Sequence, residues 1–208
     1  ILCLLLGLPE SDAPEILRLS STMGLALGVN FKANEAEIEA ATQGLYAFIG
    51  AILAERRARP GDDILSRMAA ATEDGDRLSE EELLNLAVML AFAGVDTTRN
   101  QLGLGISMFA GHPEQWETLA ADSGLDMAAA QEVMRMRPTI TWVTREAVEE
   151  FEFQGLTVPK GTVLHLYSES AGTDPGVFDD APFDITAKRA RNYGFGGGIH
   201  HCLGHLVA

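Results

Sequence analysis

Apolar residues recur every three or four positions through the first two-thirds of this 208-residue chain, which is the periodicity of amphipathic helices. One such pattern follows Asn34, a residue that can cap a helix, and it ends at Arg59-Pro60-Gly61-Asp62. Shorter helices are predicted after Pro14 and over residues 64–72, with a turn at residues 73–76. The apolar face of the longer helix carries Ile38, Ala41, Leu45, Phe48, Ile49 and Ile52.

A much longer helix is predicted from Ser79-Glu80-Glu81-Glu82, which has the spacing of a capping box. Helical sequence then continues to about Ala110, which gives about 31 residues or about 46 Å at 1.5 Å per residue. Its middle contains Gly94, Asp96 and two threonines, which are poor residues for a buried helix. Two hypotheses follow. Either the helix kinks at Gly94 with Asp96 in a salt bridge, or it is loosened where it passes a reactive centre.

Past this helix, residues 113–121 form one short helical pattern, and Asp126 is placed to cap another that ends at Pro138. Glu132 and Arg135 are three positions apart on this second helix, so their side chains lie on one face and can pair.

After Pro138 the pattern changes to alternation. Residues 150–153 and 156–158 flank a turn at Gln154-Gly155, and residues 163–167 follow a second turn. The sequence therefore predicts a mainly α fold with a small antiparallel β part.

Composition narrows the range of partners. The chain has 30 acidic and 15 basic residues and a formal net charge of -15, which argues against nucleic acid or an anionic membrane as a partner. Only Cys3 and Cys202 are present, which argues against a disulfide framework and for a reducing, cytoplasmic compartment. Residues 1–8 are apolar but too short for a membrane span, and no basic region precedes them. Because the chain begins inside an apolar run and stops where a helix begins, both ends are expected to be cut.

The most distinctive stretch runs from Phe195 to Gly204 and reads F-G-G-G-I-H-H-C-L-G. Three consecutive glycines let the backbone approach a bulky flat object, because glycine has no Cβ. Cys202 leaves this loop where Leu203, Leu206 and Val207 begin a helix-like pattern. The amide dipoles at a helix start favour a thiolate, which is the form that binds a metal. Taken alone, the loop is compatible with haem, with a small buried cysteine, or with zinc or copper held together with nearby histidines.

The spacing Phe-x-x-Gly-x-His-x-Cys-x-Gly resembles the haem-binding loop of the cytochrome P450 family. Two distant motifs point the same way: residues 93–97 match the family's oxygen-binding motif, and Glu132-x-x-Arg135 matches its structural ion pair. The resemblance implies that residues 1–208 are a partial P450 catalytic domain, truncated at both ends, of a bacterial-type soluble haem-thiolate monooxygenase.

The resemblance also implies residue roles. Cys202 would be the metal ligand of heme b, Asp96 and Thr97 would deliver protons to O₂, and Glu132 with Arg135 would support the fold. Arg145 and His200 would reach a haem propionate. The expected cofactor-binding set is Ala93, Gly94, Arg145, Phe195, Gly198, His200, Cys202 and Gly204. An apolar organic substrate is expected against Leu90, Ile140, Trp142 and Val143.

One position departs from the family. An Arg usually precedes the Phe-Asp pair and completes a triad with the Glu and Arg of the helix, but this chain has Pro182 there. Either Arg189 or Arg191 substitutes for it, or the triad is incomplete. Lys188, Arg189 and Arg191 also form a basic patch where an acidic ferredoxin or flavin-type partner, carrying electrons from NAD(P)H, would dock.

Three alternatives stay open. A non-catalytic domain would bind zinc or copper through His201, Cys202 and His205. A family member driven by peroxide, or one that isomerises its substrate, is disfavoured because the acid–alcohol pair Asp96-Thr97 is present. The isolated fragment is expected to be inactive, because half of the family's haem pocket would be missing from it.

Overall fold

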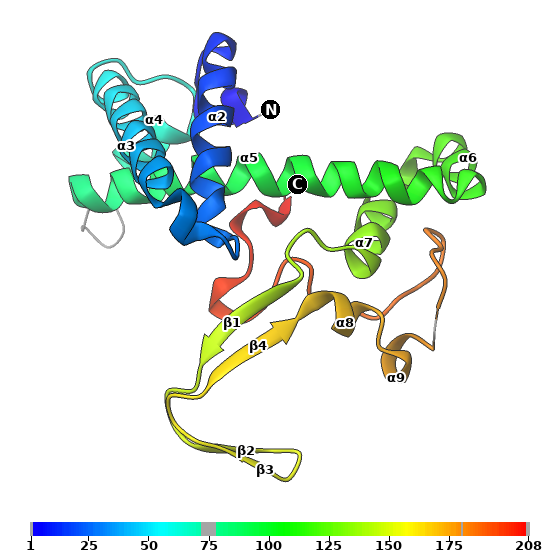
Figure 1. Ribbon diagram of the computed structural model, residues 1–208. Coiled ribbons are helices and arrows are strands. Elements are labelled where there is room, and N and C mark those ends of the chain that lie inside the picture. Colours follow the sequence, from blue (N-terminus) through cyan, green and yellow to red (C-terminus); the bar gives the residue numbers. More distant parts are fainter. Residues whose placement is uncertain (1, 72–77, 180, 207–208) are drawn as a thin grey trace. The chain divides into compact units, whose positions relative to one another are not determined.

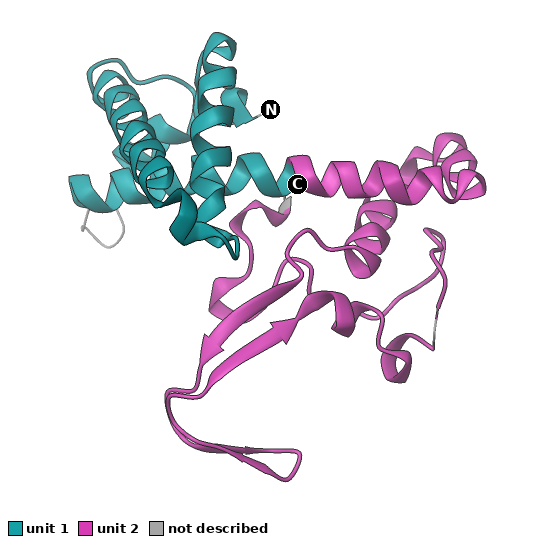
Figure 2. Ribbon diagram, in the orientation of Figure 1, with its two compact units in different colours: residues 1–98 teal, residues 99–208 magenta. Residues whose placement is uncertain are grey.

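The computed structural model describes residues 2–71, 78–179 and 181–206 (Figure 1). The turn predicted at residues 73–76, the predicted helix end at Thr72 and the apolar position Val207 lie outside these ranges. Contacts divide the chain into two compact units, residues 1–98 and 99–208, which Figure 2 shows in different colours. The long helix α5 (Glu80–Ala110) contributes residues to both units.

Unit 1 is helical. Its helices bury one apolar stripe each, so the predicted positions Ala41, Leu45 and Ile49 are all in the core. Helix α2 packs along helix α3, and both face the first half of α5 through Leu83, Ala87 and Ala91. The elements of this unit besides α5 are α1 (Leu2–Leu6), η1 (Glu10–Asp12), α2 (Ala13–Gly24), η2 (Leu25–Leu27), η3 (Phe31–Asn34), α3 (Glu35–Ala58) and α4 (Ile64–Ala70).

The capping box at the start of α5 is confirmed. Ser79 Oγ accepts a hydrogen bond from the Glu82 amide at 3.2 Å, and Glu82 Oε2 accepts from the Ser79 amide at 2.8 Å. The pKa of the Glu82 carboxyl is lowered mainly by the hydrogen bond that Ser79 Oγ donates to Glu82 Oε2 at 2.7 Å, and further by the bond from the Ser79 amide. The predicted cap at Asn34 is wrong in its chemistry, although α3 does begin at the next residue. The Asn34 side chain instead donates to the Asn30 carbonyl at 3.1 Å, four residues back.

Unit 2 contains the predicted β part, but as two separate antiparallel ladders. In one ladder Trp142 pairs with Tyr167, and in the other Phe151 pairs with Val158. The turn predicted at Gln154-Gly155 is confirmed, with φ values of 49° and 80°. The elements are α6 (Pro113–Ala121), η4 (Ser123–Leu125), α7 (Asp126–Met136), β1 (Trp142–Glu146), β2 (Phe151–Phe153), β3 (Leu156–Val158), β4 (Val163–Tyr167), α8 (Ser168–Gly172), α9 (Pro175–Phe178), η5 (Gly198–His200) and η6 (Leu203–Leu206).

Asp126 is the first residue of α7 rather than its cap. Leu125 holds the capping position, and Asp126 Oδ1 accepts only from the next amide, that of Met127, at 2.6 Å. The boundary is displaced because the 3₁₀ turn Ser123–Leu125, closed by Asp122 accepting from the Gly124 amide, leads directly into the helix.

The core of unit 2 joins an irregular segment to the helices. Phe183 packs edge-on against Phe109 of α5 with ring centroids 5.3 Å apart, and Phe109 also meets Trp116 of α6 at 5.2 Å. Ile185 is 1% exposed, and its amide donates to Gln115 of α6 at 2.9 Å. These contacts hold residues 183–185 in place next to α7. Among the described residues, no helix is both long and apolar enough to cross a membrane.

Candidate functional site

A buried ion pair lies on α7. Arg135 Nε donates to Glu132 Oε2 and Arg135 Nη2 donates to Glu132 Oε1, both at 2.8 Å, and the two side chains are only 1% and 3% exposed. The remaining Nη1 donates to the Gly172 carbonyl at 2.8 Å. A side chain at Gly172 would overlap the Arg135 carbonyl, so a glycine is needed for this close approach. The pair thus connects α7 to the end of α8 through charge-assisted bonds.

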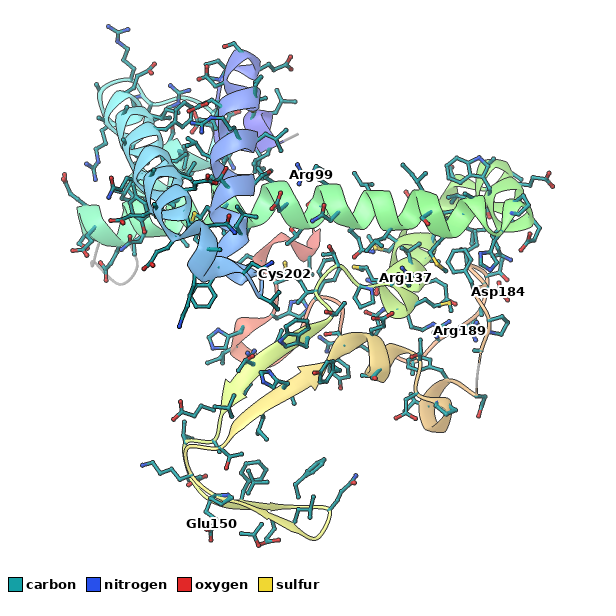
Figure 3. The ribbon with its side chains drawn as sticks, in the orientation of Figure 1. Arg99, Arg137, Glu150, Asp184, Arg189 and Cys202 are labelled. Carbon is teal, nitrogen blue, oxygen red and sulfur yellow. The ribbon has the colours of Figure 1, made fainter. Side chains whose placement is uncertain are left out.

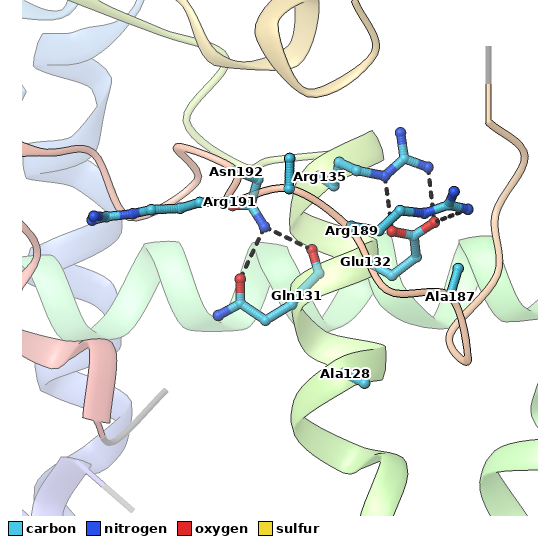
Figure 4. A pocket seen from close by; sticks show the side chains of 9 residues that line it. Ala128, Gln131, Glu132, Arg135, Ala187, Arg189, Arg191 and Asn192 are labelled. Carbon is cyan, nitrogen blue, oxygen red and sulfur yellow. Dashed lines mark hydrogen bonds and ion pairs between the residues drawn. The ribbon is translucent and has the colours of Figure 1, made fainter. Parts of the chain in front are cut away.

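A second guanidinium reaches the same carboxylate. Arg189 Nη2 lies 3.3 Å from Glu132 Oε1 (Figure 4). The same nitrogen donates to the Pro182 carbonyl at 2.8 Å. The Asp184 amide also donates to Glu132 Oε1, at 3.2 Å. Arg189 and Asp184 come from the same irregular segment, and both are labelled in Figure 3. Glu132 therefore accepts from two arginines and one backbone amide.

The electrostatics of Glu132 follow from these contacts. Burial alone would raise the pKa of the Glu132 carboxyl, but the hydrogen bonds from Arg135 and the Asp184 amide, with the charges of Arg135 and Arg189, outweigh it and hold the pKa below its ordinary value. The pKa of Asp184 is also lowered, mainly by hydrogen bonds from Thr186 and further by the charge of Arg189. At neutral pH both carboxyls are ionised, and the Glu132 carboxylate pairs with both guanidinium groups.

A pH dependence follows from the lowered pKa of Glu132. Its stabilising contribution should be fully present above its ordinary pKa of 4.5 and should be lost as the pH falls through the lower folded value. One extra proton bound by the unfolded state changes the unfolding free energy by about 1.4 kcal/mol per pH unit. Urea unfolding between pH 6 and pH 3 measures this slope. Asp184→Asn, which removes the neighbouring carboxyl whose pKa is also lowered, should keep most of this slope, and a flat profile in that variant would contradict the assignment to Glu132.

The glycine-rich loop closes on itself through its backbone. The Cys202 amide donates to the Phe195 carbonyl at 3.0 Å, and the Gly196 amide donates to the Tyr193 carbonyl at 2.8 Å. Gly196 and Gly198 both have φ of 69°, a conformation that residues with a Cβ rarely adopt. The Cys202 thiol is exposed at the start of η6 (Figure 3). The sequence thus builds a tight loop that presents one sulfur atom.

In unit 1, the central part of α5 carries the acid and the alcohol. Asp96 Oδ1 accepts from Ser21 Oγ of α2 at 3.2 Å, and Thr97 Oγ1 donates to the Ala93 carbonyl at 2.5 Å. Helix α5 is continuous across Gly94. A Cβ at Gly94 would lie 2.9 Å from Leu2 Cδ1, so this glycine gives α1 room to pack. The Thr97 bond is the back-bond that threonine makes to the preceding turn inside helices.

Comparisons with known proteins agree with these motifs. The sequence profile of the cytochrome P450 family matches residues 127–208. Over its whole length the chain is 38% identical to luteothin monooxygenase of Streptomyces thioluteus, covering 52% of that protein. It is 34% identical, over 98% of its length, to steroid C26-monooxygenase of Mycobacterium bovis, covering 47% of it. The ligand-free structure of cytochrome P450 TbtJ1 superposes on 98% of the chain with a TM-score of 0.90 and 28% identity, covering 54% of that structure.

This chain belongs to the cytochrome P450 family. It spans about half the length of the curated relatives that it matches.

As a P450, the chain can be tested for its fit to a haem. The described residues contain no group of three His, Cys, Asp or Glu side chains that could hold a metal ion, whereas a single Cys thiolate can hold the iron of a haem. Cys202 is exposed, and a Cβ at Gly198 would meet no atom within 4 Å, so space is open beside Gly198. A lone thiol beside an open glycine face is a donor set that fits a haem.

The other predicted site residues are placed as follows. Arg145 is exposed on β1 and donates to the Thr144 carbonyl at 2.8 Å, and His200 is exposed in η5. In the described structure no hydrogen bond joins them, so their meeting at a propionate stays a prediction. The predicted substrate residues Ile140 and Trp142 are exposed, while Val143 and, in unit 1, Leu90 are half-buried.

Sequence reasoning missed three polar residues. Asn192 donates through Nδ2 to the Gln131 carbonyl at 3.1 Å and to Gln131 Oε1 at 2.9 Å, which ties the segment before the loop to α7. Ser21, which donates to Asp96, is a small polar residue in an otherwise amphipathic helix. None of the three has a local pattern that signals its partner, because the partners lie 61 and 75 positions away in the sequence.

Proposed function

We propose that this P450 works as a haem-thiolate monooxygenase in the cytoplasm. The observation that carries the proposal is the exposed Cys202 thiol, held at the exit of a glycine-rich loop in a chain of this family. The overall reaction converts an organic substrate R–H, O₂, NAD(P)H and a proton into R–OH, water and NAD(P)⁺. Absorption spectroscopy of the purified full-length protein tests the cofactor. A haem Soret band is expected, and a folded protein without haem would contradict the proposal.

The chain's own residues would hold the haem. Cys202 supplies the thiolate ligand, the loop from Phe195 to Gly204 supplies a flat backbone surface, and Arg145 with His200 supplies positive groups for the propionates. When bound, a thiolate-ligated haem activates O₂ after reduction by two electrons. The protein contributes binding, orientation and protons.

Proton delivery is assigned to α5. Thr97 Oγ1 would donate a proton for the reduction of O₂, and the Asp96 carboxyl would resupply that proton through ordered water. Asp96 is half-buried and accepts from Ser21, so its carboxylate has a fixed position in unit 1. A proton relay needs neighbouring groups that can donate and accept protons, and the Asp96 carboxyl and the Thr97 hydroxyl are adjacent on one helix.

Thr97→Ala should uncouple the reaction. A positioned proton donor contributes about 10²–10⁴-fold, so hydroxylated product should fall by about a hundredfold while NAD(P)H is still consumed and its electrons appear as hydrogen peroxide. The measurement is the ratio of product to NAD(P)H oxidised in the full-length protein with its redox partner.

Thr97→Ser, which retains the hydroxyl, should restore most of the coupling, and Thr98→Ala tests an exposed threonine one position along as the matched control. Unchanged coupling in Thr97→Ala would remove Thr97 from the proton path.

The proposed substrate is a small apolar organic molecule. We assign its binding to five apolar residues: Leu90, Ala93, Ile140, Trp142 and Val143. One of the relatives is named for a steroid, which is an apolar molecule, and this supports the same class of substrate.

The proposed electron donor is an acidic ferredoxin or flavin-type protein. Lys188 and Arg191 are exposed and can meet such a partner, whereas the Arg189 guanidinium is directed to Glu132. Docking would therefore rely on Lys188 and Arg191. The zinc or copper alternative has no comparable support, since His201, Cys202 and His205 do not form a three-ligand cluster in the described structure.

A further inference from the structure

Arg189 and Arg191 are the two arginines that could replace the Arg missing at position 182, and their side chains have different contacts in the structure. Arg189 is 22% exposed and makes an ion pair with Glu132 together with a hydrogen bond to the Pro182 carbonyl. Arg191 is exposed, and within the described residues its side chain makes neither a hydrogen bond nor an ion pair. The Pro182 carbonyl thus contacts Arg189, and Arg189, seven residues further along the chain, supplies the positive charge that position 182 lacks.

Arg189 begins a series of contacts that continues toward the loop. Three residues later, Asn192 Nδ2 donates to Gln131 on α7 (Figure 4). Asn192 Oδ1 accepts from the Gly194 amide at 2.9 Å. A Cβ at Gly194 would lie 3.1 Å from Met134 Cβ, so the backbone at Gly194 packs directly on α7. Residues 189–194, which we call the strap, are therefore held to one face of α7 at three places.

The strap leads without a break into the loop that carries Cys202. The Gly196 amide donates to the Tyr193 carbonyl at 2.8 Å, and the Cys202 amide donates to the Phe195 carbonyl at 3.0 Å. These bonds fix the shape of the loop and connect it to residues 193 and 195. Residue 193 belongs to the strap and residue 195 follows the strap directly, so the strap fixes the position of both relative to α7.

We propose that Arg189 is a positioning residue: its ion pair with Glu132 anchors the strap on α7 and thereby sets the position of the Cys202 loop. The haem part of this inference rests on the proposed function, whereas the anchoring part rests on the contacts alone. Arg135 keeps its two bonds to Glu132 when Arg189 is removed, so the buried pair and the helix should survive the change.

Hydrogen exchange of backbone amides tests the anchoring without any cofactor. In Arg189→Ala, amides in residues 190–202 should exchange at least about tenfold faster, because local opening of the strap becomes easier, while amides of α7 change little. Lys188→Ala removes an equal charge from the adjacent, exposed position and should leave this exchange unchanged. Equal exchange in wild type and Arg189→Ala would overturn the proposal. If Arg189→Ala does not fold, Arg189→Met, which keeps the apolar stem, takes its place with the same expected and contradicting results.

A charge-retaining variant distinguishes the ion pair from mere packing. Arg189→Lys keeps a positive charge that can reach Glu132 from the same backbone position, and the slow exchange of residues 190–202 should be largely retained. A folded Arg189→Lys protein that exchanges as fast as Arg189→Ala would show that a charge paired with Glu132 is not what anchors the strap.

A spectroscopic measurement on the full-length haem protein completes the test. In Arg189→Ala, the fraction of the reduced, CO-bound protein that shows the thiolate-type Soret band should fall, and haem should be lost about tenfold faster, as expected when a ligand loop opens more easily. Lys188→Ala should retain haem like wild type. A full-length protein that contains no haem would refute the proposed function. The hydrogen-exchange result would still show whether Arg189 anchors the strap. Normal haem retention in a variant with a loosened strap would overturn the link between the strap and Cys202.

Discussion

Glu132→Ala is expected to abolish the folded haem protein. Arg135 is 1% exposed and would keep a buried charge with its main partner removed, and Arg189 and the Asp184 amide would lose the same acceptor. Removing one partner of a buried pair destabilises a protein by about 3–5 kcal/mol. Because a typical domain is stable by only about 5–15 kcal/mol, this loss consumes much of the stability available.

The effect is measured as the yield of soluble protein, the midpoint of thermal unfolding and the ratio of haem to protein. Glu150→Ala removes an exposed carboxylate in the turn before β2 (Figure 3) and serves as the matched control, for which no change is expected. A normal haem yield in Glu132→Ala would contradict the assignment of the buried pair as the support of the fold.

Much of the fold could be predicted because the responsible interactions are local. The capping box at Ser79 acts over three residues, and the hairpin turn at Gln154-Gly155 acts over two. The length of α5 followed from this start signal and from the stop at Gly111-His112-Pro113, and the observed helix has 31 residues. The burial of Glu132 and Arg135 was expected only from the resemblance, since a Glu and an Arg three positions apart also pair on exposed helices.

The remaining features depend on contacts between distant residues, which have no local signature. The choice between Arg189 and Arg191 is decided by Glu132, 57 positions away from Arg189. The strap residue Asn192 finds Gln131 across 61 positions, and Ser21 finds Asp96 across 75. Asn34 shows the opposite failure: its sequence context favours a cap, but a closer acceptor at Asn30 takes the side chain. Asp96 and Gly94 also have structural partners in unit 1, which their motif does not predict.

Cys202→Ser should abolish thiolate ligation. A serine hydroxyl is a far weaker electron donor to haem iron than a thiolate, and the electron density pushed by the thiolate is what favours O–O cleavage. Monooxygenase activity should therefore disappear even in molecules that retain haem through the loop and the propionate contacts. Cys3→Ser is the matched control, because Cys3 is the only other cysteine in the sequence and lies half-buried on α1 in unit 1. Activity that survives in Cys202→Ser would exclude Cys202 as the ligand.

The most direct test of haem-thiolate ligation is the absorption spectrum of the full-length protein, reduced with dithionite and exposed to carbon monoxide. We predict a strongly red-shifted Soret band in wild type and in Cys3→Ser, and the loss of that band in Cys202→Ser. A folded wild-type protein that shows no haem absorption and contains zinc instead would contradict the account.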